Sequence, residues 1–519
     1  MTASESTSAE SVETTQPVER TQSAERTQPA ERTQPVERTQ PRPAAKPTPL
    51  SGFPELLPAE RLAELQVLDQ LRRTFELHGF APIETRAAEP LDQLLRKGEV
   101  DKEVYLLRRL HAAEEETSEL GLHFDLTVPF ARYVLENAGK LEFPFRRYQI
   151  QKVWRGERPQ EGRYREFTQA DIDVVARDVL PFHHDVEVAR VMAEALSALP
   201  VPALTLQVNN RKLIEGYFHG VGAPDPAAVM RVIDKMDKVP AEVVLTMLVD
   251  DAGLTAGQAD RCLALAQIRT PNSSFVERVD ALGVRHPLLS EGLAELAAVV
   301  DGCAGLNNDR FSVVADLRIA RGLDYYTGTV FETRLAGFES LGSICSGGRY
   351  DSLASDGRTS YPGVGISLGV TRMLVPLFAR KKLTASRSVP SAVLVALPDE
   401  QSRPVSEQIA QRLRARGVPC EVAPSPQKYG KQIRFAERRG IPFVWFPAAA
   451  STADGLTGGA QPPADGLTGG AQPPADGSTG AAETDSVRDI RTGEQGPADP
   501  DSWLPPAEDL NPQIVRPES

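Results

Sequence analysis

Hydrophobic residues recur at helical spacing in two stretches of the chain. Between Pro58 and Leu77, leucines and a phenylalanine recur every three or four residues, and His78-Gly79 follows as a stop signal, so this stretch is predicted to be a helix. From about residue 223 to 304 the pattern is almost wholly helical. This second region predicts a helical insertion within an otherwise mixed α/β chain.

Other stretches alternate apolar and polar residues, as half-buried strands do. Arg147–Trp154 and Arg165–Val175 alternate at period two and flank a polar loop rich in Gly, Pro and Arg, which predicts a hairpin. The loop arginines suit phosphate oxygens, because a guanidinium group presents a planar fork of hydrogen-bond donors. For any one of these arginines alone, a solvent-exposed position on a charged hairpin is the better interpretation. The candidates for one lined surface of this hairpin are Arg155, Phe167, Gln169, Asp171 and Asp173.

Strands and helices alternate again near the C-terminus. After a linker at residues 381–390, an apolar strand begins at Ala392, and a predicted helix (Val405–Arg416) and a strand (Val418–Val422) follow. A basic helix and a last strand at Ile441–Phe446 complete the series. Alternation of this kind predicts a small, parallel-rich sheet over residues 391–447.

Two segments carry tandem repeats. Residues 1–49 contain TQPVER and its variants, and they hold too few apolar side chains to bury a core, which predicts a disordered tail. A spacer is the favoured role for this tail, and a docking segment is the alternative. Residues 448–484 contain ADGLTGGAQPP twice in succession, which predicts a flexible surface loop.

Composition narrows the class of protein. A chain of 519 residues has room for two or more domains. Its four cysteines are scattered without paired spacing, which argues against a zinc site or a disulfide framework and suits the cytoplasm. No apolar run approaches the ~20 residues of a membrane span. The net charge of −13 counts against general adhesion to nucleic acid but leaves room for a local basic surface.

The segment from Arg321 to Glu332 reads RGLDYYTGTVFE and concentrates polar chemistry at the start of a predicted strand. Polar side chains at the start of a buried strand must either pair with one another or line a binding site. A turn capped by Asp324 would explain RGLD equally well if it stood alone. The arginine-rich hairpin upstream favours a site.

Four segments occur in an order that resembles one enzyme family. They are Arg155–Phe167, Arg321–Glu332, Ser346–Leu353 (SGGRYDSL) and Gly363–Leu374 (GVGISLGVTRML). The first and last resemble the second and third signature motifs of class II aminoacyl-tRNA synthetases, and the middle two resemble histidine-specific motifs. The chain therefore resembles histidyl-tRNA synthetases over most of its length, and four ordered matches are more specific than any single fingerprint.

This resemblance implies a mixed α/β (α+β) fold. A class II antiparallel-sheet catalytic core would occupy residues 50–380 and contain the helical insertion at about 223–304. A small α/β anticodon-binding domain would occupy residues 391–447 and end within residues 485–519, where the tail beyond Gln495 would be irregular. A homodimer is also implied.

The implied activity has two steps. Histidine would be activated with ATP to histidyl-adenylate and diphosphate, and then passed to tRNA(His) with release of AMP. Mg²⁺ is expected with the ATP phosphates, but no carboxylate pair identifies its ligands. Arg155 and Arg321 would be the catalytic residues, clasping the α-phosphate from opposite sides.

The resemblance also implies binding residues. The further ATP-binding residues would be Glu157, Arg163, Arg165, Phe167 and Arg372. The histidine-binding residues would be Asp125, Thr127, Gln169, Asp173, Tyr325 and Tyr326. The tRNA-binding residues would be Lys428, Lys431, Arg434 and Arg438. The last three of these lie along one helical face, for which a solvated surface is the alternative interpretation.

Several positions depart from the family pattern. Arg86 stands where the first class II motif usually carries proline, and His123-Phe124 stand where Arg-Pro usually precede the acid of the histidine-binding segment. Thr371 replaces an acid before the arginine of the third motif, and Asp173 stands where many relatives carry glutamate.

Other classes of protein remain as alternatives. A catalytically inactive paralogue, acting as the histidine-binding regulatory subunit of ATP phosphoribosyltransferase, would share the core but generally lack the anticodon-binding domain. A synthetase specific for proline or threonine would lack the two histidine-specific motifs. A scaffold protein would leave the spacing of the arginines unexplained.

Overall fold

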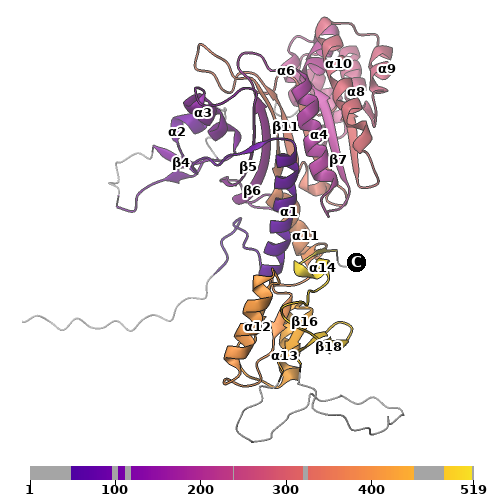
Figure 1. Ribbon diagram of the computed structural model, residues 1–519. Coiled ribbons are helices and arrows are strands. Elements are labelled where there is room, and N and C mark those ends of the chain that lie inside the picture. The colour runs from indigo at the N-terminus through magenta and orange to yellow at the C-terminus, as the bar shows by residue number, and fades with distance from the viewer. Residues whose placement is uncertain are drawn as a thin grey trace, which may run out of the picture. The chain divides into compact units, whose positions relative to one another are not determined.

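The computed structural model describes residues 48–95, 103–111, 119–237, 239–319, 325–448 and 484–516. The chain divides into one unit of residues 1–49 and a second of residues 50–519. Most of the predicted disordered tail, most of the predicted repeat loop and Arg321 lie outside the described residues. The architecture below is that of the second unit (Figure 1).

A nine-stranded sheet organises the larger part of this unit, in the order β1-β5-β6-β12-β11-β10-β7-β9-β8. Its pairings are antiparallel except for β1 with β5 and β7 with β9. The predicted mixed α/β fold with an antiparallel-rich sheet is therefore confirmed. The strands are β1 (Ala81–Pro82), β5 (Phe145–Trp154), β6 (Glu166–Val175), β7 (Leu204–Asn210), β8 (Arg269–Thr270), β9 (Phe311–Asp316), β10 (Thr329–Leu335), β11 (Cys345–Tyr350) and β12 (Gly363–Gly369).

The hairpin of β5 and β6 separates an apolar face from a polar one. Ala170, Ile172 and Val174 of β6 belong to the main hydrophobic core. Because side chains alternate along a strand, the residues between them point to the opposite face of the sheet. That opposite face carries the polar side chains of the candidate site.

Helices α1 (Pro58–Leu77) and α4 (His183–Ser197) cover the apolar face and lie together along the sheet (Figure 1). The bounds of α1 are those predicted from the apolar spacing. It begins at a proline, where the Glu60 carboxylate accepts the backbone N–H of Leu57 at 2.9 Å. Its buried residues Val67, Leu71 and Phe75 follow helical spacing into the core.

Further helices gather at one end of the sheet (Figure 1). Helix α5 runs from Arg211 to Gly220. The segment predicted to be almost wholly helical contains α6 (Pro226–Ile233), α7 (Ala241–Asp250), α8 (Ala256–Ala266), α9 (Phe275–Ala281) and α10 (Pro287–Cys303). It also contains the two-residue strand β8, which pairs with β9 and so ties the helices to the sheet.

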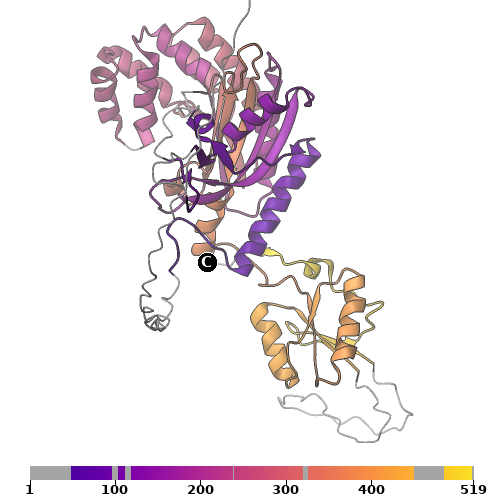
Figure 2. The same ribbon diagram turned by 90° about the vertical axis from the view of Figure 1, so that its left-hand side faces the viewer.

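A second sheet has the order β15-β14-β16-β17-β18. Helices α12 (Arg403–Ala415) and α13 (Tyr429–Arg439) flank it, as the orange helices in Figure 2 show. Its strands are β14 (Val393–Val395), β15 (Cys420–Val422), β16 (Phe443–Phe446), β17 (Ser486–Asp489) and β18 (Gln495–Pro497).

The three strands before the repeats pair in parallel, whereas β17 and β18 are antiparallel. The prediction of a parallel-rich sheet over residues 391–447 is therefore confirmed, and the antiparallel strands come from beyond that range. Because β17 pairs with β16, the chain on either side of residues 449–483 belongs to one sheet.

Smaller elements complete the described chain. They are β2 (Ala88–Pro90), α2 (Leu91–Leu94), β3 (Leu106–Leu107), β4 (Leu120–Leu122), α3 (Thr127–Asn137), α11 (Val370–Ala379), β13 (Thr384–Ala385), α14 (Ala507–Leu510) and β19 (Ile514–Val515). Strands β2, β4 and β3 form a small antiparallel sheet, and β13 pairs with β19. Among the described residues, no helix combines the length and apolar character needed to cross a membrane.

Candidate active site

A pocket of about 240 Å³ opens on the polar face of the large sheet. Its lining combines carboxylates, phenols, hydroxyls and glycine backbone. The lining residues are Thr127, Asp171, Asp173, Tyr325, Tyr326, Ser346, Gly347, Tyr350, Gly365, Ile366 and Ser367. Four of the six predicted histidine-binding residues are thus brought together in one cavity.

A buried cation stands beside this pocket. Arg147 on β5 faces Asp173 on β6 across the hairpin, with Nη2 2.6 Å from Oδ2 of Asp173 and 4.0 Å from Oδ2 of Asp171. The Arg147 guanidinium also lies 4.4 Å from the centre of the Phe130 ring. The aspartates therefore carry their charges next to a fixed positive charge rather than in isolation.

The two aspartates differ in their partners. The Tyr350 hydroxyl donates to Oδ1 of Asp173 at 2.8 Å. The Ser367 hydroxyl donates to Oδ1 of Asp171 and itself accepts from the Gln169 side-chain amide. Burial, with Asp173 as a neighbouring like charge, raises the pKa of Asp171 to about 7 despite the opposing effects of Arg147 and Ser367.

Glycines shape the wall of the pocket. A Cβ atom at Gly365 would lie 2.0 Å from Oδ1 of Asp173, and one at Gly348 would lie 2.8 Å from the Tyr326 ring. The Asp173 carboxylate and the Tyr326 ring can approach the sheet only because these positions lack a side chain. The SGGRYD motif thus has a steric role in the site.

The amino end of α3 supplies the acid and the hydroxyl predicted for histidine binding. Thr127 lines the pocket, and the Asp125 carboxylate accepts the backbone N–H of Val128 at 3.1 Å. The Tyr325 and Tyr326 rings lie 4.1 Å apart between centroids. Burial raises the pKa of Tyr325, so its phenol stays protonated.

The predicted ATP-binding residues form a second cluster at the beginning of β6. The Arg155 guanidinium lies 5.1 Å from the centre of the Phe167 ring, and its Nε donates to the Phe124 carbonyl at 2.9 Å. The Glu157 carboxylate lies 3.8 Å from Arg155 and 3.6 Å from Arg163. The guanidinium groups of Arg155 and Arg163 therefore both lie near the single carboxylate of Glu157.

Three other charged residues complete the description of this cluster. Burial and then the nearby Glu157 raise the pKa of Glu103. Arg165 donates from Nε to the Glu157 carbonyl at 3.2 Å. Arg372, at the start of α11, donates from Nη2 to the Leu341 carbonyl. Arg321, the other predicted catalytic arginine, lies outside the described residues.

Comparison with known proteins agrees with this geometry. The family model for histidyl-tRNA synthetase matches residues 52–373, and that for an anticodon binding domain matches residues 391–446. The histidine--tRNA ligase of Cutibacterium acnes is 55% identical over 474 residues, covering 90% of this chain and 98% of the relative. That of Micrococcus luteus is 56% identical over 479 residues, with the same two coverages.

The chain belongs to the histidyl-tRNA synthetase family. The crystal structure of histidyl-tRNA synthetase from Nostoc sp. PCC 7120 is similar to it, with a TM-score of 0.73 and 32% sequence identity, covering 88% of this chain and 97% of that one. The predicted resemblance is confirmed, and with it the class of ligases. The comparisons favour this family over the regulatory-subunit alternative.

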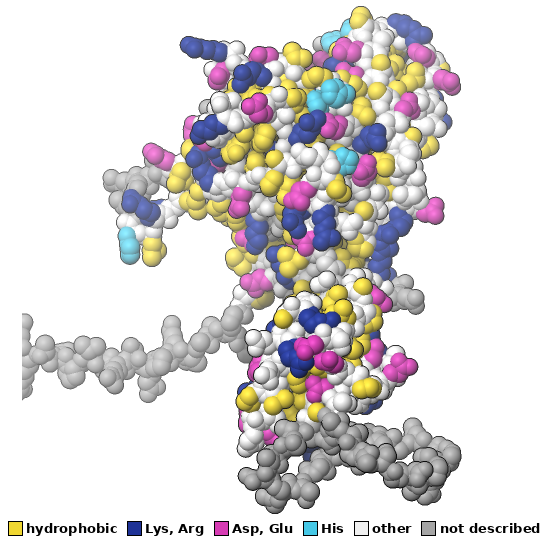
Figure 3. Space-filling view, viewed as in Figure 1, with side chains coloured by type: hydrophobic (Ala, Val, Ile, Leu, Met, Phe, Trp, Pro, Cys, Tyr) yellow, Lys and Arg dark blue, Asp and Glu magenta, His cyan; other side chains and the backbone are white. Residues whose placement is uncertain are grey.

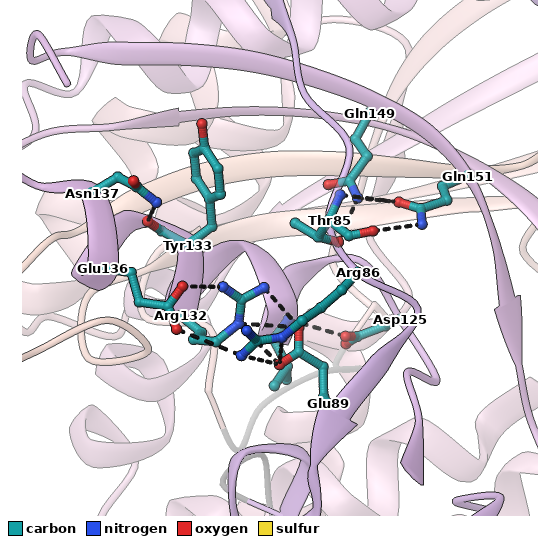
Figure 4. A network of polar contacts seen from close by, with 11 residues as sticks. Thr85, Arg86, Glu89, Asp125, Arg132, Tyr133, Glu136, Asn137, Gln149 and Gln151 are labelled. Atoms are coloured by element: carbon teal, nitrogen blue, oxygen red, sulfur yellow. Dashed lines mark hydrogen bonds and ion pairs between the residues drawn. The ribbon is translucent and has the colours of Figure 1, made fainter. Parts of the chain in front are cut away.

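Arg86, which departs from the family's first motif, belongs to a network of ion pairs (Figure 4). Its Nη2 lies 3.3 Å from Glu89 and 3.5 Å from Glu136. The Glu89 carboxylate is buried and also accepts three hydrogen bonds from Nε and Nη2 of Arg132, of which the shortest is 2.7 Å. Arg86 therefore joins a fixed charge network where the family usually has proline.

His123 stands where histidyl-tRNA synthetases usually carry arginine, and it is fully buried. Its Nε2 lies 2.7 Å from the Lys152 carbonyl, and its ring stacks on Trp154 with centroids 5.4 Å apart. Burial lowers its pKa, so the ring is neutral near pH 7. This residue thus supports the loop before Asp125 without adding a charge.

The predicted tRNA-binding residues lie on or beside α13 and are exposed. On the opposite side of that helix, the buried Gln432 exchanges two hydrogen bonds with the backbone of Leu397, at 2.9 and 2.8 Å. Figure 3 shows Lys and Arg interspersed with Asp and Glu over the face drawn. The basic character of α13 is therefore local.

Sequence reasoning missed several residues of the pocket. Arg147, Tyr350 and Ser367 all lie within segments named in the sequence analysis, but none of their side chains was assigned a role. The register of the hairpin would have placed Arg147 opposite Asp173 once the ends of both strands were known. Tyr350 and Ser367 meet the aspartates only through the order of the sheet.

Proposed function

We propose that this chain activates L-histidine with ATP and transfers the histidyl group to tRNA(His). One observation carries this proposal. Phe167, Gln169, Asp171 and Asp173 succeed one another along one face of β6, so the arginine and aromatic cluster continues directly into the acidic pocket. An anion-binding surface next to a pocket for the amino acid is what formation of an aminoacyl-adenylate needs.

In the first step, an oxygen of the histidine carboxylate attacks the α-phosphorus of ATP, and diphosphate leaves. Arg155 would hold the α-phosphate from one side and Arg321 from the other, neutralising charge that grows in the transition state. Phe167 would stack on the adenine, and Glu157 would accept from its amino group. Arg163, Arg165 and Arg372 would hold the outer phosphates or cover the base.

The pocket supports histidine as the amino acid. Asp125, Thr127 and Gln169 would accept from its ammonium group. The Gln169 Oε1 atom is buried and accepts no hydrogen bond from the described residues, so it is available for this role. Asp173, Tyr325 and Tyr326 would face the imidazole ring. A pocket of buried polar groups rejects apolar analogues, because these would leave its groups unpaired.

Mg²⁺ would enter with ATP as part of the substrate. Within the described residues, no group of three or more His, Cys, Asp and Glu side chains is arranged to hold a metal ion. The ion's ligands would therefore come chiefly from the phosphates and water. The Mg²⁺ ion would neutralise part of the negative charge of the phosphates.

In the second step, a hydroxyl of the terminal adenosine of tRNA attacks the carbonyl carbon of the adenylate, and AMP leaves. Residues 50–380 would form the catalytic domain, with the helical insertion at 223–304. Residues 391–447 and 485–519 would form the anticodon-binding domain, with Lys428, Lys431, Arg434 and Arg438 toward the tRNA. The protein would act in the cytoplasm as a homodimer.

Histidine-dependent ATP–diphosphate exchange tests this proposal. The native protein is expected to exchange with histidine alone among the amino acids, and Arg321→Ala to abolish exchange. Arg318→Ala is the matched control, since that nearby arginine pairs with Asp316 at 3.2 Å. Histidine binding without any exchange would instead support the regulatory-subunit alternative.

A further inference from the structure

Asp171 and Asp173 lie two residues apart on the same face of β6, and both line the pocket. Their relative exposures are 2% and 4%, so each carboxylate has been taken out of water. A buried carboxylate is costly unless partners satisfy its oxygens. The two aspartates therefore differ in how many of their carboxylate oxygens already have a hydrogen-bond or ion-pair partner within the protein.

Asp173 is held as part of the wall. Its Oδ1 accepts from the Tyr350 hydroxyl at 2.8 Å, and its Oδ2 lies 2.6 Å from Nη2 of Arg147. The space beside Oδ1 is closed by the backbone at Gly365, where a Cβ atom would lie only 2.0 Å away. Both oxygens of Asp173 thus have strong partners within the protein.

Asp171 is less completely satisfied. Its Oδ1 accepts from the Ser367 hydroxyl, but its Oδ2 lies 4.0 Å from Arg147, which is too far for a hydrogen bond. The neighbouring charges of Asp173 and Asp125 favour a hydrogen-bond donor beside Asp171 rather than another acceptor.

We propose that Asp171 is a specificity-determining residue whose Oδ2 accepts the ring N–H of bound histidine. This inference rests on the proposed function. Besides the contacts proposed for Asp173 and Tyr326, it gives the imidazole a third contact, which selects for a ring with an N–H donor. The raised pKa of Asp171 agrees with a carboxylate that lacks a full set of partners until a donor arrives. Ser367 and Gln169 would hold the carboxylate in place as positioning residues.

Asp171→Asn separates this role from a structural one. The amide keeps the shape of the side chain but presents a neutral group. The KM for histidine in ATP–diphosphate exchange is expected to rise at least 10-fold, because an acceptor for the ring N–H is weakened, while the KM for ATP stays unchanged. At pH 7.5 the melting temperature is expected to stay equal or rise, because the fold no longer buries this charge.

Asp316→Asn is the matched control. Asp316 is another buried aspartate of the same sheet, and it accepts from the side-chain amide of Gln207 at 2.7 Å, away from the pocket. This variant is expected to leave the KM for histidine unchanged. A purely structural role for Asp171 would lower the melting temperature and leave the KM unchanged, and that result would overturn the inference.

A second measurement does not depend on the stability of the variant. Histidine methylated on one ring nitrogen or the other is used as an inhibitor of exchange by the native protein. An inhibition constant well above the KM for histidine is expected for at least one isomer, whereas inhibition constants equal to that KM for both isomers would overturn the inference. Absence of histidine-dependent exchange in the native protein would instead overturn the proposed function.

Discussion

Arg147 and Asp173 form a buried ion pair across the β5–β6 hairpin, with 2.6 Å between Nη2 and Oδ2. Arg147 is fully buried, and none of its three guanidinium nitrogens makes a well-aligned hydrogen bond to the described residues. Charge and the face of the Phe130 ring therefore hold it in place. The acidic pocket depends on this cation, which lies outside the four segments that resemble the family's motifs.

Asp173→Asn is expected to destabilise the protein by about 3–5 kcal/mol, because it leaves a buried guanidinium without its main counter-charge. The free energy of unfolding in denaturant measures the loss. The double variant Arg147→Met/Asp173→Asn should recover much of it, since no buried charge is then left alone. Additive losses in the double variant would show that the pair is not coupled.

Asp171 makes stability depend on pH in a defined direction. Its pKa is raised by burial from 3.8 to about 7, so the folded protein holds this proton more tightly than the unfolded chain does. Its contribution to stability is therefore full below about pH 4 and is lost as the pH rises through 7. Within the described part of the chain, the charged and polar groups that act on it are Arg147, Asp173, Asp125 and Ser367.

Comparison of native protein with Asp171→Asn isolates this effect, because other carboxyl groups titrate alike in both. Between pH 5 and 7.5 the native protein should lose stability relative to the variant by on the order of 1–3 kcal/mol. Unfolding in denaturant at each pH provides the measurement. A constant difference across this range would contradict the raised pKa.

Periodicity predicted those parts of the fold that local sequence determines. Helix α1 and the hairpin of β5 and β6 follow from the spacing of apolar residues, because one face of each element packs on the core. The pairing of β17 with β16 was predictable only through resemblance to the family, since 39 residues of sequence separate the two strands.

The residues of the site that lie on one strand, β6, were predictable from the sequence. Gln169 and Asp173 were found because they alternate along β6. Tyr350 and Ser367 reach the same pocket from β11 and β12, and their proximity to the aspartates depends on a strand order with long crossovers. No local pattern encodes that order.

Arg155→Lys tests whether the planar guanidinium is required. An ammonium group cannot both donate to the Phe124 carbonyl and lie flat near Phe167 as Arg155 does. The rate of histidine-dependent exchange should fall by about 10²-fold or more. Arg146→Lys is the control: that arginine lies near the other end of β5 and pairs with Glu187 at 3.0 Å. An equal loss in both variants would indicate damage to the strand rather than to the site.

Lys431→Glu and Arg434→Glu test the exposed basic face of α13. Each should raise the KM for tRNA in histidine transfer by about 10-fold, with the effect shrinking as salt is added, because phosphate contacts release counterions. Exchange of ATP with diphosphate should not change, since that step needs no tRNA. Arg403→Glu on α12, where the arginine pairs with Glu400 at 2.7 Å, supplies the same change of charge on the other helix and should leave the KM for tRNA near its native value. If all three variants weaken transfer alike, net charge rather than this face governs the encounter with tRNA.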